Sequence, residues 1–256
     1  MKKLFIFLLC AGIGGSAIAQ KEVSAKTIFE AIDQGKAVNY EGVTITGNLD
    51  LTELSNKKRI KKSKGYEEYK SYVEVPITFR NCVFKNDFIA YKNSENEKGG
   101  KWGNTSWSIG EGATSTTDFE RSVTIENCTF EAKSEFKYSD FADKASFAGT
   151  KFQKEANFKY AGFKKESNFA NCRFGEYANF KYSDFKYDAD FFSADFRNYA
   201  DFKYANFNER VTFKGSTFNN NADFKYAEFK DSGNFDNTRF RSGIDMKYSN
   251  GKKYIN

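Results

Sequence analysis

The stretch Ala156–Tyr182, ANFKYAGFKKESNFANCRFGEYANFKY, carries a phenylalanine at every fifth or sixth position. The same alternation of 6 and 5 residues runs from Phe130 to Phe240 without a gap, and Met246 takes the next position. It accounts for 21 of the 29 phenylalanines in the 256-residue chain. An amphipathic helix has a period of about 3.6 and a strand a period of about 2, so neither explains the spacing. The pattern is typical of short faces that turn a corner after each inward-pointing residue.

The residues just before each phenylalanine are also restricted. The side chain two positions earlier is usually small, and the one immediately before is often Asn or Asp, as in Ala200-Asp201-Phe202. This unit, A-[DN]-F-x-x with an extra residue in every second copy, resembles the repeat of the pentapeptide-repeat family. The resemblance implies a right-handed quadrilateral β-helix in which the phenylalanine and the small residue point inward. We therefore predict an all-β solenoid of this kind.

A longer period defines one coil. The dipeptide Lys-Tyr follows the inward residue every 22 residues and is absent from the midpoints, which indicates 22-residue coils with four faces. Because coils stack about 4.8 Å apart, the pairs should form two neighbouring columns. We call them the Lys–Tyr ladder, which consists of Lys137, Tyr138, Lys159, Tyr160, Lys181, Tyr182, Lys203, Tyr204, Lys225, Tyr226, Lys247 and Tyr248.

The ladder has two interpretations. It is either a basic and aromatic strip that binds a glycan, an anionic polymer or an acidic partner, or a packing feature copied with a duplicated coil. In the second interpretation Asp201, Asp223 and Asp245 offset the lysines.

The repeat continues upstream with interruptions. Val123–Phe130 matches Ile77–Phe84 at an offset of 46 residues, and Val43–Leu49 resembles an earlier copy. Residues 43–116 are therefore predicted to form irregular early coils with inserts at 52–76 and 89–114, and residues 117–256 the regular β-helix. The inserts supply further candidate contacts, which are Lys57, Lys58 and Arg59 in the first and Trp102 and Trp107 in the second. A run of charges like that in the first insert also fits a solvated loop.

The two ends of the solenoid need covers, because an unpaired sheet edge invites association. Residues 20–42 contain a predicted capping helix from Ser24, the N-cap, to Gln34, with Gly35 as terminator. After Met246 about half a coil remains, so the C-terminal end should be less well covered. This suggests a homodimer through that end, as the family resemblance also implies.

The first residues have the features of a secretory signal. Lys2 and Lys3 precede an apolar run and Ala17-Ile18-Ala19 forms a cleavage site, so residues 1–19 are predicted to be removed on export to the periplasm or the medium. Cleavage would lower the net charge from +6 to +4. In an oxidising compartment Cys82 and Cys128, which should point inward on adjacent rungs, could form a disulfide. The alternative is that each simply replaces the small residue of its repeat.

The composition restricts the chemistry. The chain has no histidine, which excludes His-dependent hydrolases and ordinary zinc sites. We therefore expect a non-enzymatic envelope scaffold that binds a protein or a polymer and has no cofactor. A carbohydrate-binding or carbohydrate-active β-helix is the alternative. The resemblance also implies a DNA mimic that binds a topoisomerase such as gyrase, but the positive charge and the signal oppose it, and no nucleic-acid partner is expected.

Overall fold

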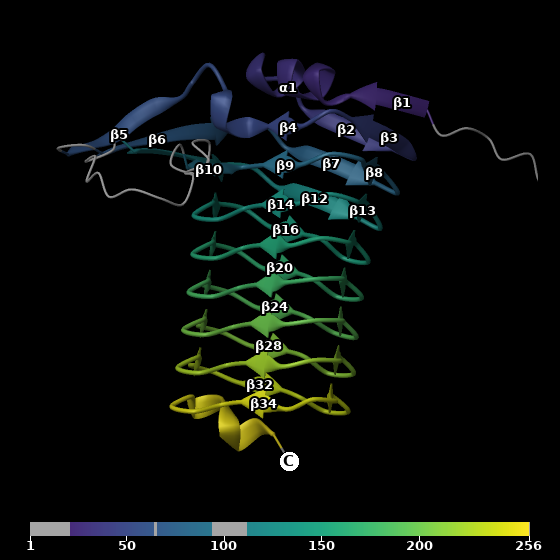
Figure 1. Cartoon of the computed structure of the whole chain (residues 1–256), viewed down its shortest axis with the longest axis vertical. Coiled ribbons are helices and arrows are strands. Elements are labelled where there is room, and N and C mark those ends of the chain that lie inside the picture. Colours follow the sequence, from purple (N-terminus) through teal and green to yellow (C-terminus); the bar gives the residue numbers. More distant parts are fainter. Residues whose placement is uncertain (1–20, 64–65, 94–111, 256) are drawn as a thin grey trace, which may run out of the picture.

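The computed structural model describes residues 21–63, 66–93 and 112–255. Short parallel strands stack into four sheets, which form the four faces of a right-handed quadrilateral β-helix (Figure 1). We number the faces in the order in which a regular coil visits them. The signal-peptide prediction and both tryptophans, Trp102 and Trp107, lie outside the described residues.

The first and second faces meet at the corner that carries the Lys–Tyr ladder. The first face consists of β4 Leu49–Asp50, β9 Phe88–Ile89, β14 Ser134–Glu135, β18 Ala156–Asn157, β22 Ala178–Asn179, β26 Ala200–Asp201, β30 Ala222–Asp223 and β34 Ile244–Asp245. The second consists of β5 Lys58–Ser63, β6 Tyr66–Val73, β11 Gly112–Phe119, β15 Asp140–Phe141, β19 Gly162–Phe163, β23 Asp184–Phe185, β27 Asn206–Phe207 and β31 Glu228–Phe229, with β10 Tyr91–Asn93 paired to β11.

The third and fourth faces meet at the opposite corner. The third consists of β2 Val38–Glu41, β7 Ile77–Arg80, β12 Val123–Glu126, β16 Ala145–Ser146, β20 Ser167–Asn168, β24 Ala189–Asp190, β28 Val211–Thr212 and β32 Gly233–Asn234. The fourth consists of β1 Lys21–Ser24, β3 Val43–Thr46, β8 Val83–Phe84, β13 Thr129–Phe130, β17 Lys151–Phe152, β21 Arg173–Phe174, β25 Asp195–Phe196, β29 Thr217–Phe218 and β33 Arg239–Phe240.

The strand register confirms the 22-residue coil, since Ala156 pairs with Ala178 and Phe163 with Phe185. The alternation of 5 and 6 residues reflects two kinds of corner. Where the spacing is 5, a tight turn with a positive φ connects the faces, as at Tyr138 and Gly149. The 6-residue spacings span the other two corners, which accommodate the extra residue.

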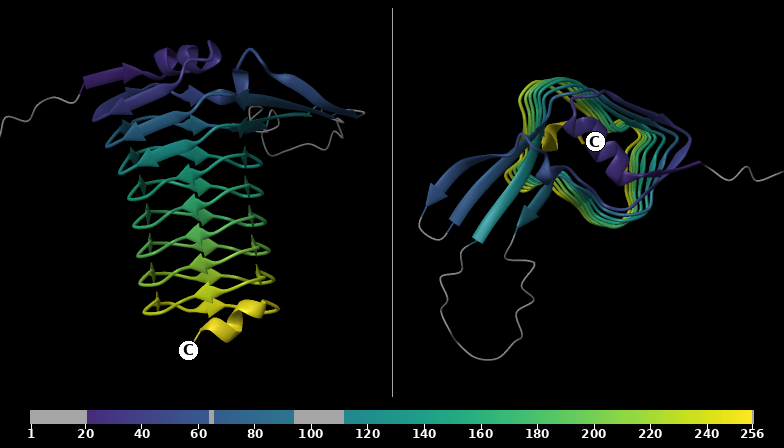
Figure 2. Two further views of the ribbon diagram at one scale, coloured as in Figure 1. Left: turned by 180° about the vertical axis from the view of Figure 1, so that it is seen from behind. Right: turned by 90° about the horizontal axis from the view of Figure 1, so that it is seen from above.

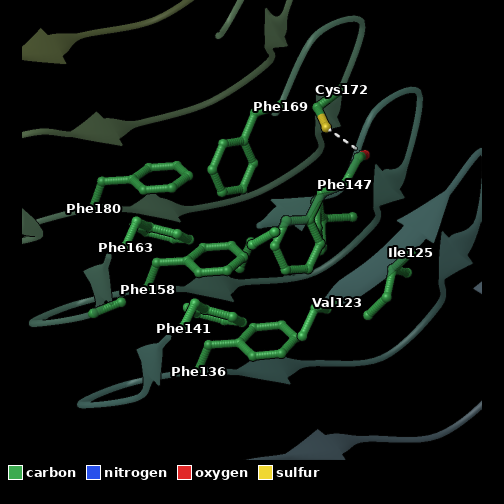
Figure 3. Close-up of a cluster of buried hydrophobic side chains, with 14 of the residues drawn as sticks. Val123, Ile125, Phe136, Phe141, Phe147, Phe158, Phe163, Phe169, Cys172 and Phe180 are labelled. Carbon is green, nitrogen blue, oxygen red and sulfur yellow. Dashed lines mark hydrogen bonds between the residues drawn. The ribbon is translucent and has the colours of Figure 1, made fainter. Parts of the chain in front are cut away.

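Phenylalanine fills the interior. In the centre of the solenoid Phe180 stacks between Phe158 and Phe202, with both ring centroids 5.0 Å away, and meets Phe169 and Phe191 edge-on. Figure 3 shows Phe158, Phe169 and Phe180 of this group. Offset-stacked and edge-to-face rings are favourable aromatic geometries, and burial of one phenylalanine stabilises the fold by about 1.5–3 kcal/mol. The repeated core therefore holds together very short strands.

The N-terminal end has the predicted helical cover. The helix α1 Ala25–Asp33 begins after Ser24, whose side chain accepts a hydrogen bond from the Lys26 amide. Ile28 and Ile32 are buried against the first coil. One sequence alignment was wrong: Val38, and not Val43, pairs with Ile77, while Val43–Thr46 belongs to the next face. Both segments alternate apolar residues, so the pattern alone did not distinguish their registers.

The two inserts supply strands that leave the solenoid. β6 and β11 pair in parallel over eight residues, and their C-terminal ends reach the interior with the apolar Val73 and Phe119 and with the fully buried Ser71 and Thr117. β5 pairs with β6 and β10 with β11, both antiparallel. We call the projecting sheet β5-β6-β11-β10 the wing. It extends the second face beyond the body near the N-terminal end (Figure 2).

The C-terminal end is covered in part by a 3-10 helix, η3 Asn250–Tyr254. The Asn250 side chain accepts a hydrogen bond from the Phe229 amide and donates one to the Phe229 carbonyl, which replaces the next strand on the second face. Another 3-10 helix in the described part of the chain, η1 Leu51–Glu53, follows β4 in the first coil.

Candidate functional site

The Lys–Tyr ladder occupies the tight corner between the first and second faces. In each coil the backbone makes a four-residue turn, closed for example by the hydrogen bond from the Ser183 amide to the Phe180 carbonyl. The tyrosine is the third residue of this turn and has φ between 57° and 62° in all six coils. Only glycine, asparagine and aspartate adopt this left-handed conformation readily, and it costs other residues about 1–2 kcal/mol.

The opposite corner shows what the turn itself requires. Its positive-φ residue changes from coil to coil but is always small or an asparagine, and the series is Asn127, Gly149, Asn171, Ser193, Gly215 and Asn237. Both corners share the same turn, yet one selects residues suited to the backbone and the other keeps tyrosine throughout. The tyrosines are therefore present despite the turn geometry.

Copying of a duplicated coil does not explain the ladder. At the opposite corner, the second residue of the turn is the position that corresponds to the ladder lysine. It varies through Ala148, Ala170, Phe192, Lys214 and Asp236. The other outward columns of the regular coils vary as well, whereas lysine and tyrosine are unchanged in all six copies. Duplication would have preserved every column equally, so something specific to this corner has kept these two.

The tyrosine rings form one continuous stack. Successive centroids lie 4.7–4.8 Å apart, with the planes within 21° of parallel. Five of the six side chains are between 37% and 65% exposed. Because each ring covers the face of the next, the solvent meets ring edges and phenol hydroxyls. The ladder therefore offers hydrogen-bonding edges and not flat ring faces.

The lysines differ between the two halves of the ladder. In the C-terminal half, Lys203 Nζ lies 3.4 Å from Asp201 and 3.5 Å from Asp223. Lys225 likewise pairs with Asp245 at 3.0 Å. Burial alone would lower the pKa of Lys203, but these two carboxylates and the Tyr199 hydroxyl raise it above its ordinary value. The expected offset of lysines by aspartates therefore holds for Lys203 and Lys225, whereas Lys247 has no carboxylate within ion-pair distance among the described residues.

In the N-terminal half the lysines lack such partners. Asn157 and Asn179 take the place of the aspartates, and within the described ranges no carboxylate is in ion-pair distance of Lys137, Lys159 or Lys181. Each cation lies 5.1–5.2 Å from the centroid of the following tyrosine ring. Burial lowers the pKa of Lys159, and so do the charges of Lys137 and Lys181. The ladder lysines of this half therefore have no direct ion pair in the described chain, although the Glu135 carboxylate, which accepts a hydrogen bond from Asn157, attracts the charge of Lys137.

The carboxylates of Asp201 and Asp223, beside the C-terminal half of the ladder, already have hydrogen-bond partners. Asp201 is 2% exposed, and Asp201 and Asp223 accept hydrogen bonds at 3.1 Å from the hydroxyls of Tyr177 and Tyr199, respectively. Both face Lys203, and Asp223 also lines a pocket of about 410 Å³ together with Asp245. Among the residues that the structure describes, no group of three or more potential metal ligands occurs. These carboxylates therefore act as anchors for neighbouring side chains.

A groove opens at the N-terminal end of the ladder. It has a volume of about 430 Å³ and lies between the wing and the first ladder pair, Lys137 and Tyr138. Tyr91 on β10 joins the two parts: its hydroxyl accepts a hydrogen bond from Lys137 Nζ at 3.0 Å, and its ring lies 5.9 Å from that of Tyr138. The remaining lining residues are Ile60, Tyr66, Glu68, Tyr69, Lys70, Asn93, Thr114 and Thr116.

The basic insert is an ordered strand and not a solvated loop. Arg59 pairs with Glu67 at 3.2 Å, and Lys57 pairs with Glu53 at 3.1 Å. Lys58 lies over the Tyr72 ring, 5.8 Å from its centroid. Two of these three predicted contact residues are therefore already neutralised. The insert contributes to the site through Ile60 and the tyrosines of β6, which sequence reasoning did not single out.

The two cysteines lie on adjacent rungs, as predicted, since Val83 pairs with Thr129. Cys82, Cys128 and Cys172 are free and buried in this structure, which agrees with the alternative that each replaces the small residue of its repeat. The Cys82 amide donates to Cys128 Sγ at 3.4 Å. A side-chain hydrogen bond with Cys128 lowers the pKa of Cys82 to about 7, and the same contact together with burial raises that of Cys128.

The architecture defines the class of protein: a four-sided parallel β-solenoid with one small and one aromatic inward residue on each face of its regular coils. The family model described as pentapeptide repeats, nine copies, matches residues 115–162, 169–217 and 202–250. The chain belongs to the pentapeptide-repeat family. No curated protein and no solved structure matches it. No helix in the described part of the chain is long and apolar enough to span a membrane.

Proposed function

We propose that this protein is a non-enzymatic binding scaffold that holds an anionic polymer along the N-terminal half of the Lys–Tyr ladder. The observation that carries the proposal is the invariance of lysine and tyrosine at a corner whose turn favours neither. Lys137, Lys159 and Lys181 form a row of cations without acidic partners, beside a row of phenol hydroxyls. A polyanion supplies the missing negative charge and accepts hydrogen bonds from both rows.

The same features argue against the alternatives. A glycosidase needs two convergent carboxyl groups, whereas Asp201 and Asp223 are held by a lysine and two phenols. A DNA mimic needs an anionic surface, and the ladder is cationic.

We infer from residues 1–20 that the chain acts in the cell envelope or outside the cell. Cell fractionation of a tagged full-length chain tests this, and retention of an uncleaved chain in the cytoplasm would contradict it.

Binding of polygalacturonate and of poly-L-glutamate to the chain lacking residues 1–19 tests the proposal. The double variant Lys159→Gln/Lys181→Gln should bind both polymers about twofold to thirtyfold more weakly, because each exposed charge contact contributes about 0.2–1 kcal/mol. Each lysine that contacts the polymer also releases a counterion. The slope of log K against log salt should therefore fall by roughly two.

The matched control is Lys165→Gln/Lys214→Gln, which removes the same charge from exposed lysines outside the ladder. Lys165 lies 4.9 Å from the centroid of the Tyr187 ring, so it reproduces a lysine–tyrosine contact at another corner. Its substitution should leave binding nearly unchanged. Equal losses in the two double variants would show that only net charge matters, and would refute the ladder as the binding surface.

A further inference from the structure

The wing groove carries a second set of recognition groups next to the ladder. Its floor is one side of the wing, formed by β6, β11 and β10, and Lys137 and Tyr138 close it toward the solenoid. A ligand in the groove would therefore continue directly onto the ladder. The volume of about 430 Å³ is within the range of small-molecule sites, about 300–1,000 Å³.

The charged groups that the wing contributes to the groove are already paired, and only Lys137 of the ladder has no acidic partner there. Glu68 pairs with Lys61 at 3.2 Å, and Lys70 pairs with Asp118 at 2.7 Å. Lys137 donates to the Tyr91 hydroxyl and lies 4.2 Å from the centroid of that ring. A free anion would have to compete with these contacts, so the groove is a poor site for an isolated phosphate or carboxylate.

The rest of the lining is aromatic and hydroxylated. It combines four tyrosines, two threonines and Ile60, whose side chain is 50% exposed. Tyrosine offers an apolar body with a polar tip. A pyranose ring has the complementary surface, because its faces carry C–H groups and its rim carries hydroxyls.

An extended peptide fits the groove less well. Peptides that bind to sheets add a strand to an unpaired edge. β6 pairs with β5 and β11, and β11 pairs with β6 and β10, so the backbones of β6 and β11 are used on both sides, and among the described strands only the three-residue β10 leaves an edge of the floor unpaired. The groove thus recognises a ligand through side chains.

We propose that the wing groove binds a sugar unit, so that the polymer on the ladder is an acidic glycan. This inference rests on the proposed function, because it assigns the chemical class of the same polymer. The neutral sugar ring lies in the groove against the wing, and the acidic groups of the following units meet Lys137, Lys159 and Lys181.

The test compares polyanions that differ in backbone. Hyaluronate, in which a neutral sugar alternates with an acidic one, should bind at least about tenfold more tightly than poly-L-glutamate of equal charge. Neutral oligosaccharides of glucose, mannose and N-acetylglucosamine form a third arm, in which at least one should bind weakly at the groove. The variant Ile60→Arg fills the groove from an exposed position, and Tyr91→Ala removes the residue that joins the wing to the ladder.

Both groove variants should remove the preference for glycans while poly-L-glutamate binding stays within about twofold. Tyr187→Ala is the control, since Tyr187 is an exposed tyrosine at another corner, and it should keep the preference. Circular dichroism of each variant verifies folding. If the folded protein binds all polyanions equally and no neutral oligosaccharide, the sugar inference is overturned while the polyanion proposal stands. If Lys159→Gln/Lys181→Gln leaves polymer binding unchanged, the proposed function is refuted, and the sugar inference, which rests on it, is refuted with it.

Discussion

Tyr204 shows why the ladder is informative at the scale of one residue. Its left-handed backbone costs about 1–2 kcal/mol, and its two stacked neighbours, Tyr182 and Tyr226, each return about 0.5–1.5 kcal/mol. Both ring centroids lie 4.7 Å away. Strain and stacking therefore nearly cancel, so stability alone does not select tyrosine here.

This balance gives the first prediction. Tyr204→Asn should change the free energy of unfolding by about 1 kcal/mol or less, because asparagine relieves the strain as it removes the stacking. Urea denaturation followed by circular dichroism measures the change. Asn237→Tyr is the reverse test, because it places a tyrosine at a positive-φ position of the opposite corner, where no column of tyrosines returns the stacking energy, and it should destabilise the fold. A loss of several kcal/mol from Tyr204→Asn would make the ladder a structural necessity and contradict our interpretation.

Tyr199 provides a prediction about pH. Burial raises its pKa to about 12 from an ordinary value of 10.0, and the charges of Asp201 and Asp223 act in the same direction. The folded state favours the neutral phenol, so this contribution to stability is complete below pH 10 and is lost between pH 10 and 12. The free energy of unfolding should fall more steeply over that interval in the parent than in Tyr199→Phe. Parallel curves would contradict the assignment.

The cysteine pair remains a prediction that depends on the compartment. Cys82 and Cys128 lie on adjacent rungs, so an oxidising thiol–disulfide exchange system could join them with transfer of two electrons and two protons to its own disulfide. Mass spectrometry of the exported chain, with and without reductant, should show the bond. The bonded form should be more stable by about 2–4 kcal/mol. Recovery of fully reduced protein from the periplasm would contradict the prediction.

At the scale of the element, each coil is supported by its neighbours on both sides. Phe180 stacks on Phe158 and Phe202, whereas Phe240 in the last coil stacks only on Phe218. Phe180→Ala should therefore lower the free energy of unfolding by about 3–5 kcal/mol, and Phe240→Ala by clearly less. Chemical denaturation of both variants measures the difference. Equal losses would show that the end coil is packed as tightly as the centre.

The elements also show which features the sequence could predict. Inward phenylalanines are forced by packing in every coil, so their spacing predicted the faces, and the 22-residue period of the Lys-Tyr dipeptide predicted the coil length and the ladder. The wing depends on pairing between β6 and β11, whose matching residues are 46 positions apart, and no local pattern specifies it. The groove was missed for the same reason. Alternating apolar residues on both Val38–Tyr40 and Val43–Ile45 likewise allowed the wrong register.

At the scale of the whole molecule, the two ends are finished differently. Helix α1 covers the first coil, whereas η3 replaces a strand only on the second face. In the described chain no further strand pairs with β32, β33 or β34. Phe240, Ile244 and Met246 are also only partly buried there. Unpaired edges beside apolar side chains are typical of an interface.

A second copy fits this end by symmetry. A two-fold axis perpendicular to the solenoid places the last strands of two copies edge to edge in antiparallel pairs, and extends the phenylalanine core across the junction. The chain should therefore be a dimer in sedimentation equilibrium, and Ile244→Lys should shift it to a monomer. Ile60→Lys, at an exposed apolar residue near the other end, is the control and should remain dimeric. A monomeric parent, or a dimer that Ile244→Lys leaves intact, would exclude this interface and leave the ladder on a single solenoid.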